Sequence, residues 1–221
     1  MSVRERHKEA RKRRIIAAAE ALVRASGDIG FSMLELASLA KVSPATPYNL
    51  FGTKSEILYD LLNSYLDRLG EDLSRDSEAD LVDQHPLDTF LSFIERAVDL
   101  FAMDPALFRP LFKFLLSVSD PQHRPAYLAR SERHWDFALD RIASAIELDL
   151  PPRSFVEQYL TSVSLGVVGR WSMEELNREE TIRHMKTTGL LFLFPFADEA
   201  NRRCIQERLE RTIPAGTKVA G

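Results

Sequence analysis

The stretch GFSMLELASLAKVSPATPYNLFGTKSEIL, residues 30–58, decides the fold. Ser32 stands before an apolar run and is followed three residues later by Glu35, which is the capping-box pattern that opens a short helix. After a tight turn, Ser43 and Pro44 predict an N-cap followed by proline at the first position of another helix. Two short helices joined by a turn of three or four residues are typical of a helix-turn-helix unit.

The side chains of this unit suit contact with DNA, because the second helix of a helix-turn-helix enters the major groove. That helix offers short polar and aromatic groups to phosphates and base edges. A lysine at the start of the next helix can clamp a phosphate together with exposed backbone N–H groups. The predicted DNA-binding residues are Ser43, Ala45, Thr46, Tyr48, Asn49 and Lys54. The alternative is that these residues only face solvent, whereas Phe31 and Phe51 are expected in the core.

Helical periodicity extends outward from this unit over the whole chain, which predicts an all-α protein. Gly27 is the expected stop of the first helix, and Thr53 with Glu56 forms a second capping box that opens a long helix. Pro110 is expected to kink or restart the helix that contains it. We expect helices at about 4–26, 33–40, 44–51, 53–69, 87–103, 106–118, 124–148, 152–170, 178–194 and 198–211. The acidic segment 74–86 is interpreted as a loop and 213–221 as a disordered tail.

Charge is divided unevenly along the chain. Residues 1–57 carry ten Lys or Arg and six Asp or Glu, a net of +4, which leaves −8 for the remainder. A basic head on an acidic body predicts that the head meets a polyanion. The basic residues of 4–14 are expected to reach the minor groove or the DNA backbone as an arm. The alternative is a solvated, disordered tail that only raises the local concentration of DNA.

Composition argues against several other classes of protein. No run of about 18 apolar residues occurs, so no membrane span is expected. Cys204 is the single cysteine, and the histidines lack metal-ligand spacing, so neither a metal nor a cofactor is predicted. The GVVG at 166–169 lies within a helical pattern rather than in a phosphate loop, and no catalytic Ser/His/Asp set can be singled out. We therefore predict a cytoplasmic protein that is not an enzyme.

The order AxLAxVSxxTxYxxFxxKxEIL closely resembles the N-terminal domain of the tetracycline-repressor (TetR) family, over about residues 11–70. The resemblance implies a three-helix DNA-binding head followed by an all-helical domain for effector binding and dimerisation. Three residues depart from the family pattern. Lys41 stands where glycine is usual, which implies a strained lysine at positive φ. Pro47 is expected to loosen the start of the recognition helix, and Leu50 replaces a common histidine that can donate to a phosphate.

The second region is rich in large aromatic side chains, which as a set suggest an apolar cavity for an effector. The predicted ligand-binding residues are Phe101, Phe108, Phe112, Trp135, Tyr159 and Trp171. The alternative is that these rings simply fill a core. Small residues at 162–169 predict close helix packing across a homodimer interface, which we expect to use 155–168 and 178–194 in a four-helix bundle.

These observations combine into one prediction for the whole chain. Residues 1–70 form the DNA-binding domain with its connecting helix, and 71–221 form the effector-binding and dimerisation domain. The homodimer binds a palindromic double-stranded operator, as a repressor, and is released by a small hydrophobic effector. Two alternatives remain open at this point: a helical-bundle enzyme that uses the C-terminal cavity, and a ligand-free interaction protein with a filled core.

Overall fold

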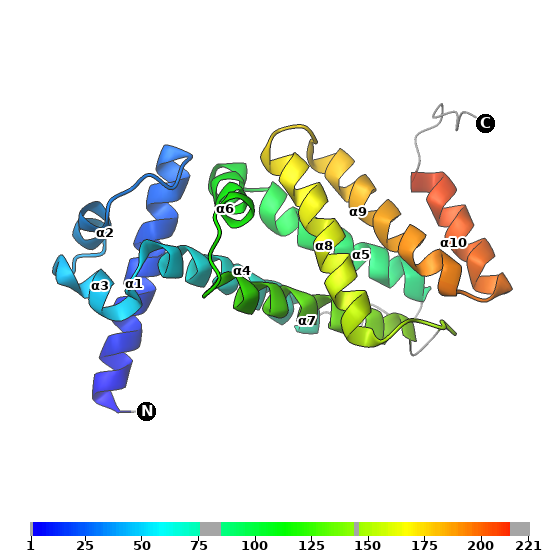
Figure 1. Ribbon diagram of the computed structural model, residues 1–221, viewed down its shortest axis with the longest axis horizontal. Helices are drawn as coiled ribbons and strands as arrows, with labels where there is room; N and C mark the ends of the chain where they lie inside the picture. The colour runs from blue at the N-terminus through cyan, green and yellow to red at the C-terminus, as the bar shows by residue number, and fades with distance from the viewer. Residues whose placement is uncertain (1, 76–84, 144–145, 213–221) are drawn as a thin grey trace. The chain divides into compact units, whose positions relative to one another are not determined.

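The computed structural model describes residues 2–75, 85–143 and 146–212 (Figure 1). The regular structure of these residues is helical apart from one isolated antiparallel bridge between Leu148 and Ala197, so the all-α prediction is confirmed. The elements are α1 (Val3–Ser26), α2 (Met33–Leu39), α3 (Ala45–Phe51), α4 (Lys54–Arg75), α5 (Pro86–Ala102), α6 (Pro105–Ser117), α7 (Arg124–Ala143), α8 (Arg153–Ser172), α9 (Arg178–Leu193), the 3₁₀ turn η1 (Phe194–Phe196) and α10 (Glu199–Thr212).

Most helix ends lie within two residues of the predicted ones, because caps and prolines are local signals. The main differences are that α4 continues to Arg75 and that α7 ends at Ala143. The rest of the predicted loop, 76–84, and the predicted tail, 213–221, lie outside the described residues. The helix does not restart at Pro110, since α6 runs unbroken through this buried proline.

Packing divides the chain into two compact units. The first unit comprises 1–68 and 104–128, and the second comprises 69–103 and 129–221. By packing, α6 and the start of α7 therefore belong with the helix-turn-helix head. The predicted functional boundary near residue 70 stays a prediction, since compactness does not report which residues bind DNA or effector.

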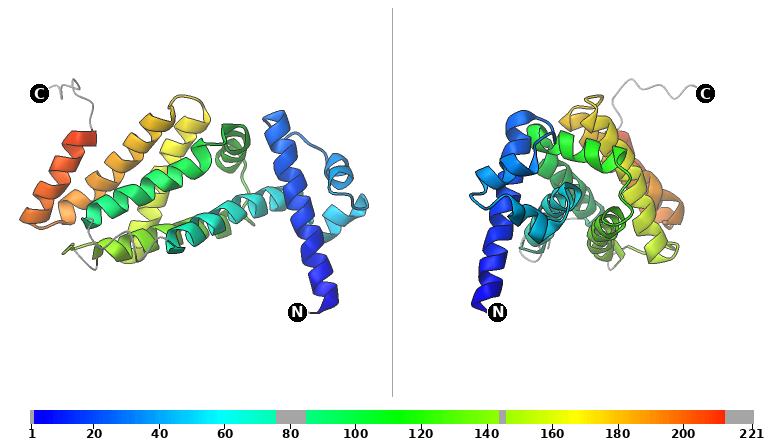
Figure 2. Two further views of the ribbon diagram at one scale, coloured as in Figure 1. Left: turned by 180° about the vertical axis from the view of Figure 1, so that it is seen from behind. Right: turned by 60° about the vertical axis from the view of Figure 1, so that its left-hand side comes forward.

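In the first unit, α1 packs against α2 and α6, and the left view of Figure 2 shows α1 between these two helices. Ile15 and Val23 of α1 are fully buried, as is Leu36 of α2. The Arg24 guanidinium of α1 donates to Asp104, just before α6, at 2.8 Å. Apolar burial and this ion pair fix α1 as the central support of the head.

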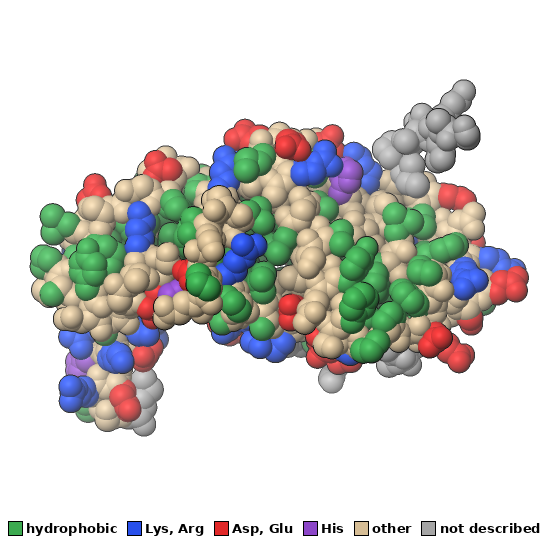
Figure 3. Space-filling model, in the orientation of Figure 1, with side chains coloured by type: hydrophobic (Ala, Val, Ile, Leu, Met, Phe, Trp, Pro, Cys, Tyr) green, Lys and Arg blue, Asp and Glu red, His purple; other side chains and the backbone are tan. Residues whose placement is uncertain are grey.

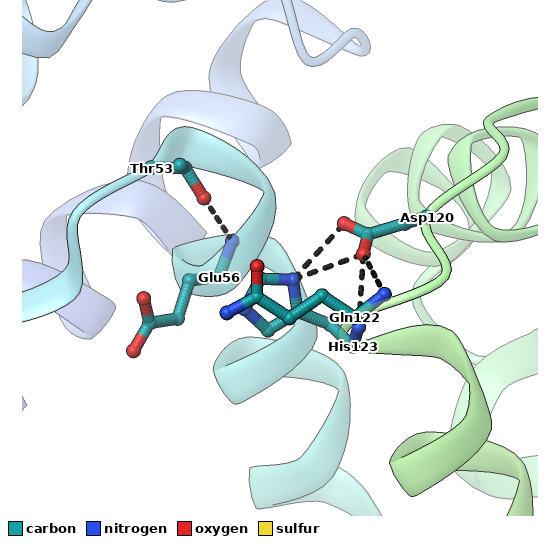
Figure 4. Close-up of polar contacts among 5 residues, drawn as sticks. All are labelled: Thr53, Glu56, Asp120, Gln122 and His123. Carbon is teal, nitrogen blue, oxygen red and sulfur yellow. Dashed lines mark hydrogen bonds and ion pairs between the residues drawn. The ribbon is translucent and has the colours of Figure 1, made fainter.

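An aromatic contact joins α4 to the loop between α6 and α7, and Figure 4 shows the polar contacts within that loop. The buried Tyr59 ring of α4 lies 5.8 Å from the His123 ring and 5.2 Å from the Phe114 ring, measured between centroids. Asp120 accepts hydrogen bonds from the backbone N–H groups of Gln122 and His123 at 3.1 and 2.8 Å. These bonds shape the loop, so that the start of α7 is held against α4 within this unit.

In the second unit, α9 packs against α5, α8 and α10. Gly189 allows α9 to lie close to α5, because a Cβ added at this glycine would lie 2.8 Å from Phe90 Cε1 of α5. At the end of the bundle, Arg208 of α10 donates to both carboxylate oxygens of Asp88 on α5, at 2.8 and 2.6 Å. The hydrogen bond from Arg208 lowers the pKa of Asp88. Close packing at Gly189 thus joins α9 to α5, and the bidentate ion pair joins α10 to α5.

Candidate nucleic-acid interface

The helices α2 and α3 and the turn between them form a helix-turn-helix. The Ser32 hydroxyl accepts from the Glu35 N–H at 3.1 Å and the Glu35 carboxylate accepts from the Ser32 N–H at 2.7 Å, which confirms the predicted capping box. In the turn, the Val42 N–H donates to the Ala37 carbonyl at 3.0 Å. Lys41 has a φ of 53°, so the lysine predicted to be strained does lie in the left-handed region.

The start of α3 differs from its prediction. Pro44 is the N-cap residue, and no side chain caps the helix. Ser43, expected to cap, instead shares a 2.8 Å hydrogen bond with the Thr46 hydroxyl. Pro47 is buried at the third position of α3, where a backbone N–H has no partner within the helix. The proline therefore removes no hydrogen bond from within α3, while the Thr46 N–H donates to the Ser43 carbonyl at 2.9 Å, a 3₁₀-type bond at the start of the helix.

Five of the predicted DNA-binding residues lie together on α3 and the turn that leads into it. Ser43, Ala45 and Asn49 are exposed, and Thr46 is half-buried. The Tyr48 side chain is 56% exposed, which is a large exposed fraction for an aromatic residue. These side chains form one surface that a flat or grooved partner can touch. Phe31 and Phe51, in contrast, are buried as expected.

Lys54 occupies a different environment, because its ammonium is bound within the head. It donates to the Phe31 carbonyl at 2.7 Å and lies 4.4 Å from the centroid of the Phe31 ring. Burial lowers the pKa of Lys54, while the carboxylates of Asp28 and Glu35 oppose that effect. The bond to Phe31 uses one of the three N–H donors of an ammonium. Lys54 thus ties the start of α4 to the segment before α2, a role that the sequence pattern did not indicate.

Lys12 is a further residue that the sequence analysis treated only as part of a basic segment. Its ammonium lies 5.1 Å from the centroid of the Phe51 ring at the end of α3, a distance typical of a cation–π contact. The signal in the sequence is spacing, since Lys12 is three residues before Ile15 and seven before Ala19, both fully buried. Lys12 therefore marks the side of α1 that faces α3.

The predicted ligand-binding residues fall into separate aromatic clusters. In the first unit, Phe108 lies 5.9 Å from Phe112, ring centroid to ring centroid. In the second unit, Phe101 lies 4.8 Å from Trp171 in an edge-to-face arrangement, whereas Trp135 lies 6.2 Å from Phe90. Tyr159 is 44% exposed on α8 and stacks on Phe192 of α9. The two predicted residues of the first unit thus lie together, whereas those of the second unit contact different rings: Phe101 pairs with Trp171, Trp135 with Phe90, and Tyr159 with Phe192.

A pocket of about 290 Å³ lies in the second unit, near η1 and the start of α10. Its lining mixes charged and apolar side chains, and none of the predicted ligand-binding residues belongs to it. The lining residues are Glu147, Asp149, Pro195, Phe196, Ala197, Asp198 and Arg202. Within the described ranges, no group of three or more metal-ligating side chains is close enough to hold a metal ion. None of the helices described is long and apolar enough to cross a membrane.

No family model matches the sequence, and no curated protein matches it either. Solved structures do match the fold. A TetR transcriptional regulator from Rhodococcus sp. RHA1 superposes with a TM-score of 0.68 at 19% identity, covering 85% of this chain and 97% of that one. The chain has the TetR fold.

Two other structures with the TetR fold were solved with small molecules bound. FadR of Thermus thermophilus, a TetR-family transcriptional repressor in complex with lauroyl-CoA, matches with a TM-score of 0.62 at 19% identity, covering 82% of this chain and 93% of that one. RolR in complex with resorcinol matches with a TM-score of 0.59 at 17% identity, covering 92% and 96%. The TetR fold of this chain thus extends from its head through its C-terminal helices.

Proposed function

We propose that this protein is a TetR-family DNA-binding transcriptional regulator that represses from a palindromic operator in the cytoplasm and is released by a small hydrophobic effector. The observation that carries the proposal is the exposed surface of α3, presented by a helix-turn-helix on a head of net positive charge. A major groove accepts a helix of this kind, and its phosphates attract the positive head.

The side chains of α3 divide between two tasks in this proposal. Asn49 suits a base edge, because its amide donates and accepts at once. Tyr48 and Thr46 carry hydroxyls that donate to phosphate oxygens and set the register of the helix. Ser43 and Ala45 lie at the entrance of α3, where small side chains let the backbone approach the DNA. Lys54 adds positive charge beside the same surface, while its bond to Phe31 holds the start of α4 in place.

The effector part of the proposal is supported by the fold and by the aromatic content of the body. Proteins of the same fold bind lauroyl-CoA and resorcinol, molecules with an apolar chain or ring. Residues 71–221 are proposed as the effector-binding and dimerisation domain, and 1–70 as the DNA-binding domain. A hundredfold loss of operator affinity on effector binding requires about 2.7 kcal/mol of coupling between the two sites.

The proposal is tested by selecting an operator from random double-stranded DNA with the purified protein. We expect an enriched palindrome, and Tyr48→Ala is expected to weaken binding to it by about ten- to a hundredfold, since one exposed contact is lost. Release of the selected DNA by resorcinol or a neutral apolar analogue tests the effector class in the same assay. If no DNA sequence is enriched, that result favours the two alternatives, an enzyme or a protein-interaction module.

Lys54 is tested on the same operator by gel-shift titration over a range of salt concentrations. Lys54→Ala is expected to weaken binding across sequences and to lower the salt dependence by about one counterion per protomer. Lys113→Ala, which removes an exposed lysine from α6 of the same unit, is the matched control and should leave the salt dependence unchanged. If Lys54→Ala lowers thermal stability but leaves the salt dependence intact, the residue has only its structural role.

A further inference from the structure

The N-terminal half of α1 is a capped helix rather than an extended arm or a disordered tail. The Ser2 hydroxyl accepts from the Glu5 N–H at 3.2 Å, and the Glu5 carboxylate accepts from the Ser2 N–H at 2.6 Å. Figure 1 shows this half of α1 extending past α2 and α3, and Figure 3 shows Lys and Arg side chains gathered on it. The positive charges of this segment are therefore held in a fixed helical register.

That register places three cations on one face of α1. Arg4, Lys8 and Arg11 precede the fully buried Ile15 by steps of four, three and four residues, so all four lie in one row along the helix. We call Arg4, Lys8 and Arg11 the basic stripe; all three are exposed. Because Ile15 packs into the head, the basic stripe continues the face of α1 that supports the helix-turn-helix.

Lys12 relates this face to the recognition helix. Its ammonium lies over the Phe51 ring at the end of α3, and Lys12 is the immediate neighbour of Arg11 in the chain. Arg4 lies eight residues earlier, which is about 12 Å farther along the helix axis. The basic stripe thus begins beside α3 and leads away from it, over a length equal to about three to four base pairs of duplex DNA.

We propose that the basic stripe is a second DNA-binding surface, which holds the phosphate backbone flanking the half-site that α3 reads. The inference rests on the proposed function and adds to it a footprint longer than the recognition helix alone. Arginine guanidinium groups pair with phosphate oxygens in bidentate geometry, and the planar guanidinium loses less freedom per hydrogen bond formed than a lysine ammonium does. The N–H groups of the first turn are not required, and that of Glu5 is already bound to the Ser2 hydroxyl.

The chemistry of the segment favours DNA over a lipid surface. A helix that lies on a membrane inserts an apolar face, but 4–14 contains no large apolar side chain. Glu5 is bound to the Ser2 N–H, and Glu9 lies about a third of a turn away from the basic stripe, so neither carboxylate interrupts the row of cations. A regular row of positive charge without an apolar face is matched by a regular row of phosphates.

The test compares two arginine pairs in the full-length protein, on the operator selected from random DNA. Arg4→Gln with Arg11→Gln removes two charges from the basic stripe. Arg6→Gln with Arg13→Gln removes two exposed charges with the same spacing from the opposite face of the same helix. Both variants have the same net charge and keep the Ser2–Glu5 cap. Circular dichroism and thermal unfolding confirm that the head remains folded.

We expect the stripe variant to bind the operator at least about tenfold more weakly at 0.15 M salt and to lose about two counterions per protomer from the salt dependence. Its ethylation-interference footprint should lose the outer phosphates and keep those nearest the recognition helix. The opposite-face variant should keep the full footprint. Equal losses in the two variants, or no loss in either, would overturn the inference and leave the proposed function standing. Failure to select any operator would instead count against the proposed function itself.

Discussion

Lys41 shows how a single residue can combine strain with a position next to the proposed DNA-binding surface. Its φ of 53° places a side chain with a Cβ in the left-handed region, within the turn that leads to Ser43 and α3. The left-handed conformation costs an L-residue about 1–2 kcal/mol, and only glycine avoids most of that cost. The strain concerns the backbone of Lys41 alone, because the rest of the turn is stabilised by the hydrogen bond from the Val42 N–H to the Ala37 carbonyl.

Lys41→Gly is expected to raise the free energy of unfolding by about 0.5–1 kcal/mol, because relief of the strain exceeds the added flexibility of the unfolded chain. Chemical denaturation of the purified protein measures the change. Lys113→Gly is the control, because this lysine lies inside α6 in ordinary helical conformation. There glycine should lower the free energy of unfolding by about 1 kcal/mol. Equal destabilisation by both substitutions would show that Lys41 carries no strain.

Among the helices, the contact between α5 and α9 depends on the absence of one side chain. A Cβ at Gly189 would lie 2.8 Å from Phe90 Cε1 and 3.1 Å from Ile94 Cδ1. The Phe90 ring also packs against the Trp135 ring, at 6.2 Å between centroids, which restricts its movement. Close approach at Gly189 therefore sets the distance between these two helices.

Gly189→Ala is expected to lower the free energy of unfolding by about 1–2 kcal/mol, because overpacking exceeds the gain in helix propensity. Gly70→Ala in α4 is the matched control, since an added Cβ there meets only His134 Nε2 at an ordinary 3.5 Å. That substitution should raise the free energy of unfolding by up to about 1 kcal/mol. Denaturant titration measures both, and stabilisation by Gly189→Ala would contradict the packing argument.

At the scale of the whole molecule, the second unit leaves an apolar surface on α8 and α9 exposed to water. Phe155, Tyr159 and Leu191 are 55%, 44% and 57% exposed, and Figure 3 shows hydrophobic side chains gathered over these helices. Soluble proteins avoid large exposed apolar patches unless a partner covers them. We therefore propose that the protein dimerises through 155–168 and 178–194, as the sequence predicts.

Leu191→Glu is expected to convert a dimer into a monomer at micromolar concentration, because two carboxylates would be buried near the symmetry axis. Met103→Glu is the control, since this methionine is 74% exposed at the end of α5 and lies outside α8 and α9. Sedimentation velocity distinguishes the two states. A wild-type monomer, or a Leu191→Glu dimer of unchanged stability, would place any dimer interface elsewhere.

Local signals in the sequence determined the helices and the position of the helix-turn-helix. The Ser32–Glu35 capping box and the stop at Gly27, which has a φ of 70°, are both present as predicted. Caps and apolar periodicity depend on residues within about one or two turns, so the sequence reports them directly. The strain at Lys41 was expected from the resemblance to the TetR family, in which glycine is usual at this turn position, and the φ of 53° agrees with that expectation.

Contacts between distant residues were decided only by the folded chain. The Lys54 bond to Phe31 joins residues 23 apart, and the packing of 104–128 with the head joins segments separated by α5. The aromatic residues likewise contact rings on other helices: Phe108 lies 4.6 Å from Tyr65 of α4 in the first unit, and Trp171 lies 4.8 Å from Phe101 of α5 in the second. Periodicity shows which face of a helix is apolar, but any apolar face can cover it. Tertiary packing alone selects the partner, because apolar burial is non-directional.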